Sequence, residues 1–243
     1  MPTIQHITSA AFMALAFQMT SALSTQEANV TVTNSTACAS VHMILGRGST
    51  ETVPGSLESL VTLVTADFPE ANYENIDYPA TDETTSDSYF LGRVAAAKQL
   101  IAYREKCPES KIVVLGYSEG ALCIDDAITG SSGNEYLGNV SQPLVPIDVT
   151  QSVTALVLYG NPRHMPYQPY NVFNLTQNVT GKYPKTKEKL AYFNKAIGSA
   201  TADYCNVNDI VCASGTSLTA HESYTDVWNY DAAAFIKSKI LGN

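Results

Sequence analysis

Short apolar runs alternate along the chain with stretches whose apolar residues recur at helical spacing. The strand pattern occurs at residues 41–45, 73–78, 111–116 and 153–159, and the second run is the weakest. The helical pattern occurs at residues 56–67, 89–103, 119–128 and 230–240. Strands that alternate with helices in this order form a parallel sheet that helices cover on both faces. We therefore expect one α/β domain, because no repeat or linker divides the chain after residue 24.

The first 24 residues have the pattern of a secretory signal peptide. Residues 10–17 are an apolar run of about half the length that spans a bilayer, and Ala22 and Ser24 are the small residues expected before a cleavage site. The segment before this run carries no Lys or Arg, so an amphipathic N-terminal helix stays as the alternative. Five glycosylation sequons agree with secretion to the extracellular space: Asn29, Asn34, Asn139, Asn174 and Asn178.

Cysteine usage also fits an exported protein. The five cysteines are Cys38, Cys107, Cys123, Cys205 and Cys212, and their spacing with the four histidines matches no metal motif. Disulfides are the default in an oxidising compartment, and an odd count leaves one thiol over. We expect Cys123 to be this thiol, buried and inert, because it lies in the apolar stretch 121–124.

Charge and composition exclude several classes of protein. The chain has 243 residues with 14 Lys and Arg against 23 Asp and Glu, which gives a net charge of −9 without a basic cluster. Nucleic acids and anionic membranes bind through positive charge, so neither is an expected partner. With 45% hydrophobic and 15% charged residues, the chain is too apolar to be disordered.

The clearest chemical motif is Gly-Tyr-Ser-Glu-Gly at residues 116–120. It follows the strongest strand pattern and precedes a helical one, which is the context of a nucleophile elbow with Ser118 on a tight strand-to-helix turn. An ordinary serine N-cap is the alternative for the same pattern.

A serine nucleophile needs a base, and the base needs a carboxylate that orients it. In the chain order Ser, acid, His, only His164 and His221 follow Ser118. Asp209 lies between Cys205 and Cys212, and a bridge between these cysteines would hold its carboxylate in place. We therefore favour Asp209 with His221 over Asp148 with His164.

These residues resemble those of the cutinase/acetylxylan esterase family of secreted α/β-hydrolases. The resemblance runs from Cys38 to the C-terminus and includes Gly-Arg-Gly-Ser-Thr-Glu at 46–51, Cys107-Pro108, residues 116–120, residues 205–212 and His221. It implies that Ser118 is the nucleophile, His221 the base and acid, and Asp209 the orienting carboxylate. It also implies disulfides Cys38–Cys107 and Cys205–Cys212.

The resemblance further implies a single-domain minimal α/β-hydrolase without a lid. Its sheet would have five mainly parallel strands in the order 2-1-3-4-5, with helices on both faces. The boundaries would be a signal peptide at 1–24, a flexible segment at 25–37 and a catalytic domain at 38–243. The oxyanion hole would comprise the N–H groups of Ser49 and Glu119 and the Ser49 hydroxyl. Ser49 and Ser118 would converge, because strands one and three are neighbours in that order.

Glu119 departs from the family pattern, which usually has Gln at this position. A carboxylate about 5 Å from the oxyanion would cost on the order of 3 kcal/mol at an effective dielectric near 20. We therefore expect the Glu119 side chain to turn away and meet Arg47, or to be protonated.

Other polar residues have simpler interpretations. His42 lies in an apolar strand and is expected to be a hydrogen-bonded core residue, and His164 is expected to be a loop histidine rather than part of the cleft. Adjacent helical residues point about 100° apart, so Asp125 and Asp126 do not form a glycosidase pair.

The expected activity is ester hydrolysis through an acyl-enzyme. Residues 215–224 around His221 carry many hydroxyls and one bulky aliphatic, Leu218, which favours an acetylated polysaccharide such as xylan over the cutin polyester. A catalytically inactive secreted protein that binds a cell wall or recognises a host is the alternative from another class. We expect a monomer that needs no cofactor or metal.

Overall fold

A computed structural model describes residues 37–82, 84, 87–172, 176 and 178–243. The expected signal peptide, the segment 25–36 and the sequons at Asn29, Asn34 and Asn174 lie outside the described residues. The described part of the chain belongs to one compact unit. None of its helices is both long and apolar enough to cross a membrane.

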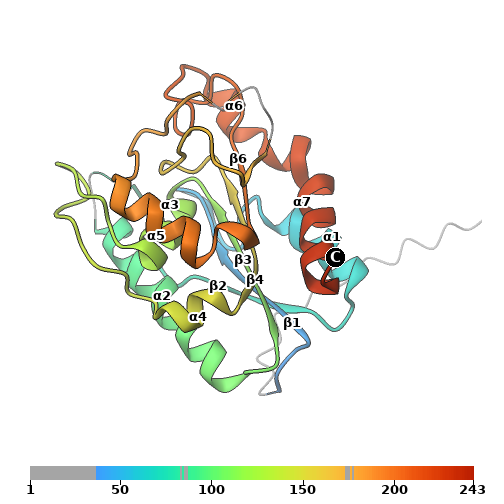
Figure 1. Cartoon of the computed structure of the whole chain (residues 1–243). Helices are drawn as coiled ribbons and strands as arrows, with labels where there is room; N and C mark the ends of the chain where they lie inside the picture. The colour runs from blue at the N-terminus through green and yellow to red at the C-terminus, as the bar shows by residue number, and fades with distance from the viewer. Residues whose placement is uncertain (1–36, 83, 85–86, 173–175, 177) are drawn as a thin grey trace, which may run out of the picture. The chain divides into compact units, whose positions relative to one another are not determined.

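The centre of the fold is a parallel β-sheet (Figure 1). Its strands are β1 (Val41–Gly46), β2 (Asn72–Asn75), β3 (Lys111–Tyr117), β4 (Val153–Tyr159), β5 (Asn171–Val172) and β6 (Thr201–Tyr204). They lie in the order β2-β1-β3-β4-β6-β5, and every neighbouring pair is parallel. The first four strands in space follow the expected order 2-1-3-4, and β6 takes the fifth place. The expected count of five was wrong by one, because β5 adds two residues at the edge beside β6.

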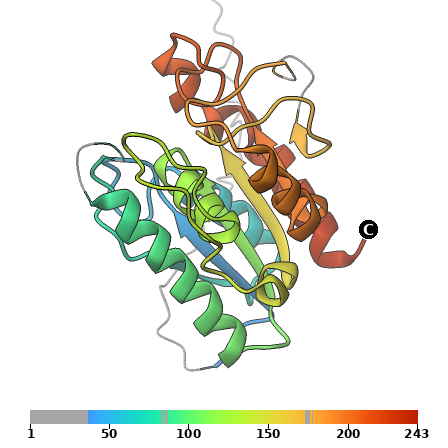
Figure 2. The ribbon, with the colours of Figure 1, turned by 60° about the vertical axis from the view of Figure 1, so that its left-hand side comes forward.

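Helices cover both faces of the sheet. They are α1 (Glu58–Asp67), α2 (Ser88–Lys106), α3 (Glu119–Thr129), α4 (Ile147–Gln151), α5 (Lys187–Ala196), α6 (Leu218–Glu222) and α7 (Tyr224–Leu241), with a short 3-10 turn at Gly198–Ala200. Figures 1 and 2 show α1 and α7 together on one face of the sheet and α2 and α3 on the other. The α7 helix begins six residues before the predicted start at residue 230. The reason is that Tyr224 and Asn229 are buried polar positions, which the apolar pattern does not mark.

The alternation of side chains along β3 explains why two layers of helix are needed. Ile112 and Val114 pack into one core cluster with residues of α2, α3 and α5. Val113 and Leu115 point to the opposite face and pack with residues of α1 and α7. Burying each such side chain contributes about 1.5–3 kcal/mol. The strand is therefore apolar throughout, as a central strand of a parallel sheet must be.

The carboxyl ends of β1 and β3 meet at one edge of the sheet, where Gly46 pairs with Gly116. The start of α3 lies so close to this edge that a Cβ on Gly120 would be 2.0 Å from the Gly46 carbonyl oxygen. Only glycine fits there. This close approach brings the loop after β1 and the turn after β3 together.

Two disulfides join segments at the ends of the sheet. Cys38–Cys107 links the chain before β1 to the end of α2, and Cys205–Cys212 closes the loop after β6. These are the pairings that the family resemblance implies. Cys123 is a buried thiol on α3 whose Sγ lies 3.6 Å from the Tyr89 carbonyl oxygen.

Candidate active site

Ser118 occupies the sharp turn between β3 and α3. Its backbone angles are φ 53° and ψ −117°, a strained conformation for a residue with a side chain. The turn is held by a 2.9 Å hydrogen bond from the Ser118 N–H to the Tyr159 carbonyl on β4. A Cβ on Gly116 would lie 2.7 Å from the Ala121 Cα, so both glycines of the motif are needed for this tight packing. The strained turn is the geometry expected of a nucleophile elbow.

His221 lies on the short helix α6 and reaches the Ser118 side chain. Its Nε2 is 2.8 Å from Ser118 Oγ. The Ser217 hydroxyl caps this helix by accepting from the Ala220 N–H, and the Tyr117 hydroxyl donates to the His221 carbonyl at 3.0 Å. The His221 ring is buried, so its position is set by packing on several sides.

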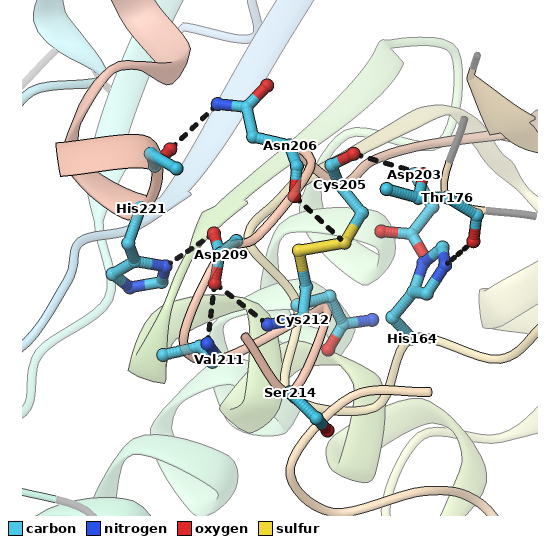
Figure 3. Close-up of a disulfide and its surroundings, with 12 residues drawn as sticks. His164, Thr176, Asp203, Cys205, Asn206, Asp209, Val211, Cys212, Ser214 and His221 are labelled. Atoms are coloured by element: carbon cyan, nitrogen blue, oxygen red, sulfur yellow. Dashed lines mark hydrogen bonds and ion pairs between the residues drawn. A yellow bond between two sulfur atoms is a disulfide. The ribbon is translucent and has the colours of Figure 1, made fainter. Parts of the chain in front are cut away.

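Asp209 completes the line of side chains, and Figure 3 shows its contact with the His221 ring. Its Oδ2 is 2.8 Å from His221 Nδ1, and its Oδ1 accepts from the N–H groups of Val211 and Cys212 at 2.5 and 2.9 Å. The Tyr224 hydroxyl donates to Oδ2 at 2.6 Å. Burial by itself raises the pKa of the Asp209 carboxyl, but the hydrogen bonds from His221, Tyr224 and Val211 hold that pKa below its ordinary value. Asp209 is therefore an acceptor that directs the Nδ1 proton and leaves Nε2 to accept from Ser118.

The loop after β1 places Ser49 beside the start of α3. The Ser49 hydroxyl donates a 2.8 Å hydrogen bond to the Glu119 carboxyl, which is almost fully buried. The expected contact between Glu119 and Arg47 was wrong, and the alternative that Glu119 is protonated stays a prediction. Arg47 donates to the carbonyls of Glu51 and Tyr78 at 2.8 and 2.7 Å, because its guanidinium bridges the loop after β1 to the loop after β2.

The loop that carries Ser49 is held from several directions. The Glu51 carboxylate accepts from the N–H groups of Gly48 and Ser56 at 2.7 and 2.9 Å. The Thr50 N–H donates to the Ala80 carbonyl at 2.6 Å, and the Tyr78 hydroxyl donates to the Arg47 carbonyl. The polar residues of the stretch 46–51 make the hydrogen bonds that hold this stretch as a rigid turn.

The other two histidines among the described residues are structural. His42 is buried in β1 and contacts Asn72 Oδ1 at 2.6 Å, as expected of a core histidine. His164 is fully buried and pairs with Asp203 at 2.8 Å, so it is neither at the cleft nor beside Asp148. Figure 3 shows the Cys205–Cys212 disulfide between this pair and the His221–Asp209 pair.

Asp125 and Asp126 belong to a buried network of ion pairs. Asp125 contacts Lys185 at 2.5 Å, and Asp126 receives two hydrogen bonds from Arg163 at 2.6 and 2.9 Å. Each carboxylate is thus neutralised by its own cation, which agrees with their rejection as a glycosidase pair. Within the described residues, no cluster of three or more potential metal ligands occurs.

Sequence reasoning missed two residues that shape the site. Tyr224 holds the Asp209 carboxyl, and its raised pKa, caused by burial and by Asp209, keeps the phenol a hydrogen-bond donor. Gly160 follows β4 with φ 59°, and a Cβ there would lie 2.8 Å from His221 Cε1. The sequence carried a signal only for Gly160, which is a glycine directly after an apolar strand. It carried none for Tyr224.

Comparison with known proteins agrees with this geometry. A family model described as Cutinase matches residues 37–240. Cutinase 11 of Verticillium dahliae is 30% identical over 214 aligned residues, and the match covers 84% of this chain and 70% of that protein. An acetylxylan esterase of Hypocrea jecorina is 30% identical over 212 aligned residues, with coverage of 84% and 68%. The catalytic core domain of acetyl xylan esterase from Trichoderma reesei superposes with a TM-score of 0.71 at 27% identity, covering 84% of this chain and 100% of that one.

Proposed function

We propose that Ser118, His221 and Asp209 are the catalytic triad of this chain. The chain belongs to the cutinase family and is therefore a carboxylic ester hydrolase. The observation that carries this proposal is the unbroken line of hydrogen bonds from Ser118 Oγ through the imidazole to Asp209, with both distances at 2.8 Å. A nucleophile, a base and an orienting acceptor in contact are the requirements for acyl transfer.

The proposed reaction has two steps. Ser118 Oγ attacks the acyl carbon while its proton passes to His221 Nε2, and the tetrahedral intermediate collapses when the same proton passes to the leaving alcohol. Water then attacks the acyl-enzyme and loses a proton to His221, which passes it to Ser118 Oγ as the carboxylic acid is released. The oxyanion of each intermediate would lie between the N–H groups of Ser49 and Glu119 and the Ser49 hydroxyl.

We propose an acetylated polysaccharide such as xylan as the substrate. Solvent-exposed hydroxyl side chains occur shortly before His221 in the chain, at Ser214 and Thr216 in the loop before α6 and at Thr219 on α6. Hydroxyls suit a sugar polymer, which is bound by hydrogen bonds, whereas a long acyl chain needs an apolar groove. A relative and a solved structure named acetylxylan esterase support this assignment.

Cutin is the second candidate substrate, and two exposed aliphatic side chains favour it. Val207 and Leu218 flank the loop of Asp209 and are 56% and 54% exposed. They offer apolar surface close in sequence to Asp209 and His221, and a relative is named cutinase.

We propose that the enzyme is secreted as a monomer after cleavage behind Ser24. Two disulfides and exposed sequons at Asn139 and Asn178 support an extracellular location. N-terminal sequencing of the secreted protein should begin at Thr25, peptide N-glycosidase should lower its apparent mass, and gel filtration should give the mass of one chain.

Hydrolysis of p-nitrophenyl acetate tests the triad. Ser118→Ala should lower kcat by about 10⁴-fold or more, whereas Ser238→Ala on α7 is the matched control and should keep full activity. Equal activity of Ser118→Ala and wild type would contradict the triad, and an inactive wild type would favour the wall-binding or host-recognition alternative.

Polymer substrates separate the two esterase assignments. Acetate release from acetylated xylan, with kcat/KM that falls from p-nitrophenyl acetate to the hexanoate and palmitate esters, is the result expected for the acetyl esterase. Release of hydroxy fatty acids from cutin, with preference for the longer esters, would assign the cutinase activity instead.

A further inference from the structure

Glu119 is a buried acid in direct contact with a proposed oxyanion donor. It is the first residue of α3, next to Ser118, and its side chain is 1% exposed. The Ser49 hydroxyl donates to its Oε2 at 2.8 Å. A hydroxyl has a single hydrogen, so the hydrogen that points at Glu119 is not available to a substrate oxyanion.

The backbone of Ser49 does not depend on this contact. Glu51, Arg47 and Ala80 hold the loop through hydrogen bonds of 2.6–2.9 Å to groups on both sides of Ser49. The Ser49 Cα and N–H are therefore fixed by other residues. What the Glu119 contact decides is the direction of the Ser49 hydroxyl hydrogen.

The protonation state of Glu119 reverses the direction of that hydrogen bond. A carboxylate can only accept, so it takes the Ser49 hydrogen. A protonated carboxyl can donate to Ser49 Oγ, and a glutamine could do the same through its amide N–H₂. In either of these two cases the Ser49 hydrogen is released and can turn to the oxyanion.

The charged groups of the loop that carries Ser49 have partners of their own. Arg47 and Glu51, both from the loop after β1, are held by backbone carbonyls and backbone N–H groups. Burial first, and then Cys123 and Glu119, raise the pKa of Tyr78 well above its ordinary value, so this phenol is neutral. His221 contacts the hydroxyl of Ser118, the residue before Glu119, through Nε2.

We propose that Glu119 is a positioning residue that switches the Ser49 donor of the oxyanion hole: its carboxylate withholds the Ser49 hydrogen, and its protonated form releases it. This inference rests on the proposed function. It predicts that the hole works with its backbone donors alone at high pH and gains a third donor in acid.

A double-mutant cycle tests the proposal. Glu119→Gln should raise kcat on p-nitrophenyl acetate at pH 8 by about 10-fold or more with little change in KM, because the oxyanion exists only in the transition state. Ser49→Ala should cost less than about 5-fold in kcat in the wild type but about 10²-fold in the Glu119→Gln background. Glu222→Gln is the matched control, because it removes an exposed negative charge next to His221 without touching Ser49, and its kcat should stay near that of the wild type.

The pH dependence separates a switch from a structural role. The ratio of kcat of Glu119→Gln to that of the wild type should fall toward 1 as the pH is lowered from 9 to 5, since every other group of the site is common to both proteins and its effect cancels from the ratio. If the ratio of the two kcat values did not change with pH, the proposed release of the Ser49 hydrogen in acid would be overturned. Equal costs of Ser49→Ala in both backgrounds would overturn the proposal as a whole.

Two further measurements keep the outcomes distinct. Thermal unfolding of each variant establishes that it is folded before its kcat is compared. Labelling with a fluorophosphonate, followed by mass spectrometry, reports whether Ser118 is a reactive nucleophile. An unlabelled wild type overturns the proposed function, whereas a labelled wild type without a gain in Glu119→Gln overturns only the switch.

Discussion

The Tyr224 hydroxyl donates to the same oxygen of Asp209 that accepts from His221. The two hydrogen bonds are 2.6 and 2.8 Å long, and both end on Oδ2. Tyr224 opens helix α7, directly after the turn that follows His221. The phenol therefore fixes the carboxylate from a rigid element that the Asp209 loop does not contain.

Tyr224→Phe should weaken both catalysis and stability in acid. A hydrogen bond to a charged group contributes about 1.5–3 kcal/mol, so we expect kcat/KM to fall about 10-fold or more. The lowered pKa of Asp209 stabilises the fold above the pKa of the unfolded state, and this contribution is lost as the pH falls through the folded pKa. In Tyr224→Phe the pKa of Asp209 is lowered less than in the wild type. The free energy of unfolding of the variant, measured by denaturant titration, should therefore begin to fall at a higher pH. Tyr230→Phe on the same helix, at a side chain that is 82% exposed, should change neither quantity.

Gly160→Ala should displace His221 while the protein stays folded. The added Cβ would lie 2.8 Å from His221 Cε1, and the backbone has φ 59°. We expect kcat to fall about 10²-fold, because small misplacements of a catalytic group are costly. Gly242→Ala is the control, since Gly242 has φ 76° but no atom within 4 Å of an added Cβ. If both variants kept full activity, Gly160 would not determine the place of the imidazole.

The two disulfides should have separable effects. Cys205–Cys212 closes a loop of about 8 residues, which is worth about 2.5 kcal/mol, and Cys38–Cys107 closes one of about 70, worth about 4.4 kcal/mol in the same chain-entropy account. Replacing the first pair by serines should lower kcat strongly, because Asp209 lies inside that loop. Replacing the second pair should cost more stability and little kcat. Urea unfolding and steady-state kinetics measure the two effects, and a larger kcat loss from the second pair would contradict the assignment.

The buried pair of His164 and Asp203 should contribute to stability in a pH-dependent way. Burial lowers the pKa of His164, but Asp203 more than compensates and raises that pKa above its ordinary value. The contribution is therefore complete below the unfolded pKa of about 6.5 and is lost as the pH rises through the folded pKa. We expect Asp203→Asn to cost about 3 kcal/mol at pH 5 and less at pH 9. Asp77→Asn, at an exposed position, is the control and should show no such trend. If the cost of Asp203→Asn grew as the pH rose, the expected direction of the pH dependence would be contradicted.

The backbone strain at Ser118 should be measurable as a difference in the free energy of unfolding between two variants. Glycine adopts positive φ without a Cβ penalty, so Ser118→Gly should be more stable than Ser118→Ala by about 1 kcal/mol, although both are inactive. Denaturant unfolding of the two variants makes the comparison. Equal stabilities would mean that the turn stores no strain.

Much of the architecture could be predicted from local pattern. The strands β1, β3 and β4 and the helices α1 to α3 lie where apolar periodicity put them, within a few residues. The strands β5 and β6 went unpredicted because they have two and four residues. Runs so short carry too little periodicity to be separated from loop.

The identities of Ser118, Asp209 and His221 as a candidate triad were already determined by the sequence, because residue type and chain order are contained in short contiguous motifs. The partners of Glu119, Asp203 and Tyr224 were decided only by the tertiary structure. Each of these contacts joins residues from different elements, at the carboxyl ends of the strands or the start of a helix. A hydrogen bond between distant residues depends on where the whole fold puts two atoms to within a few tenths of an ångström, and no local pattern carries that information.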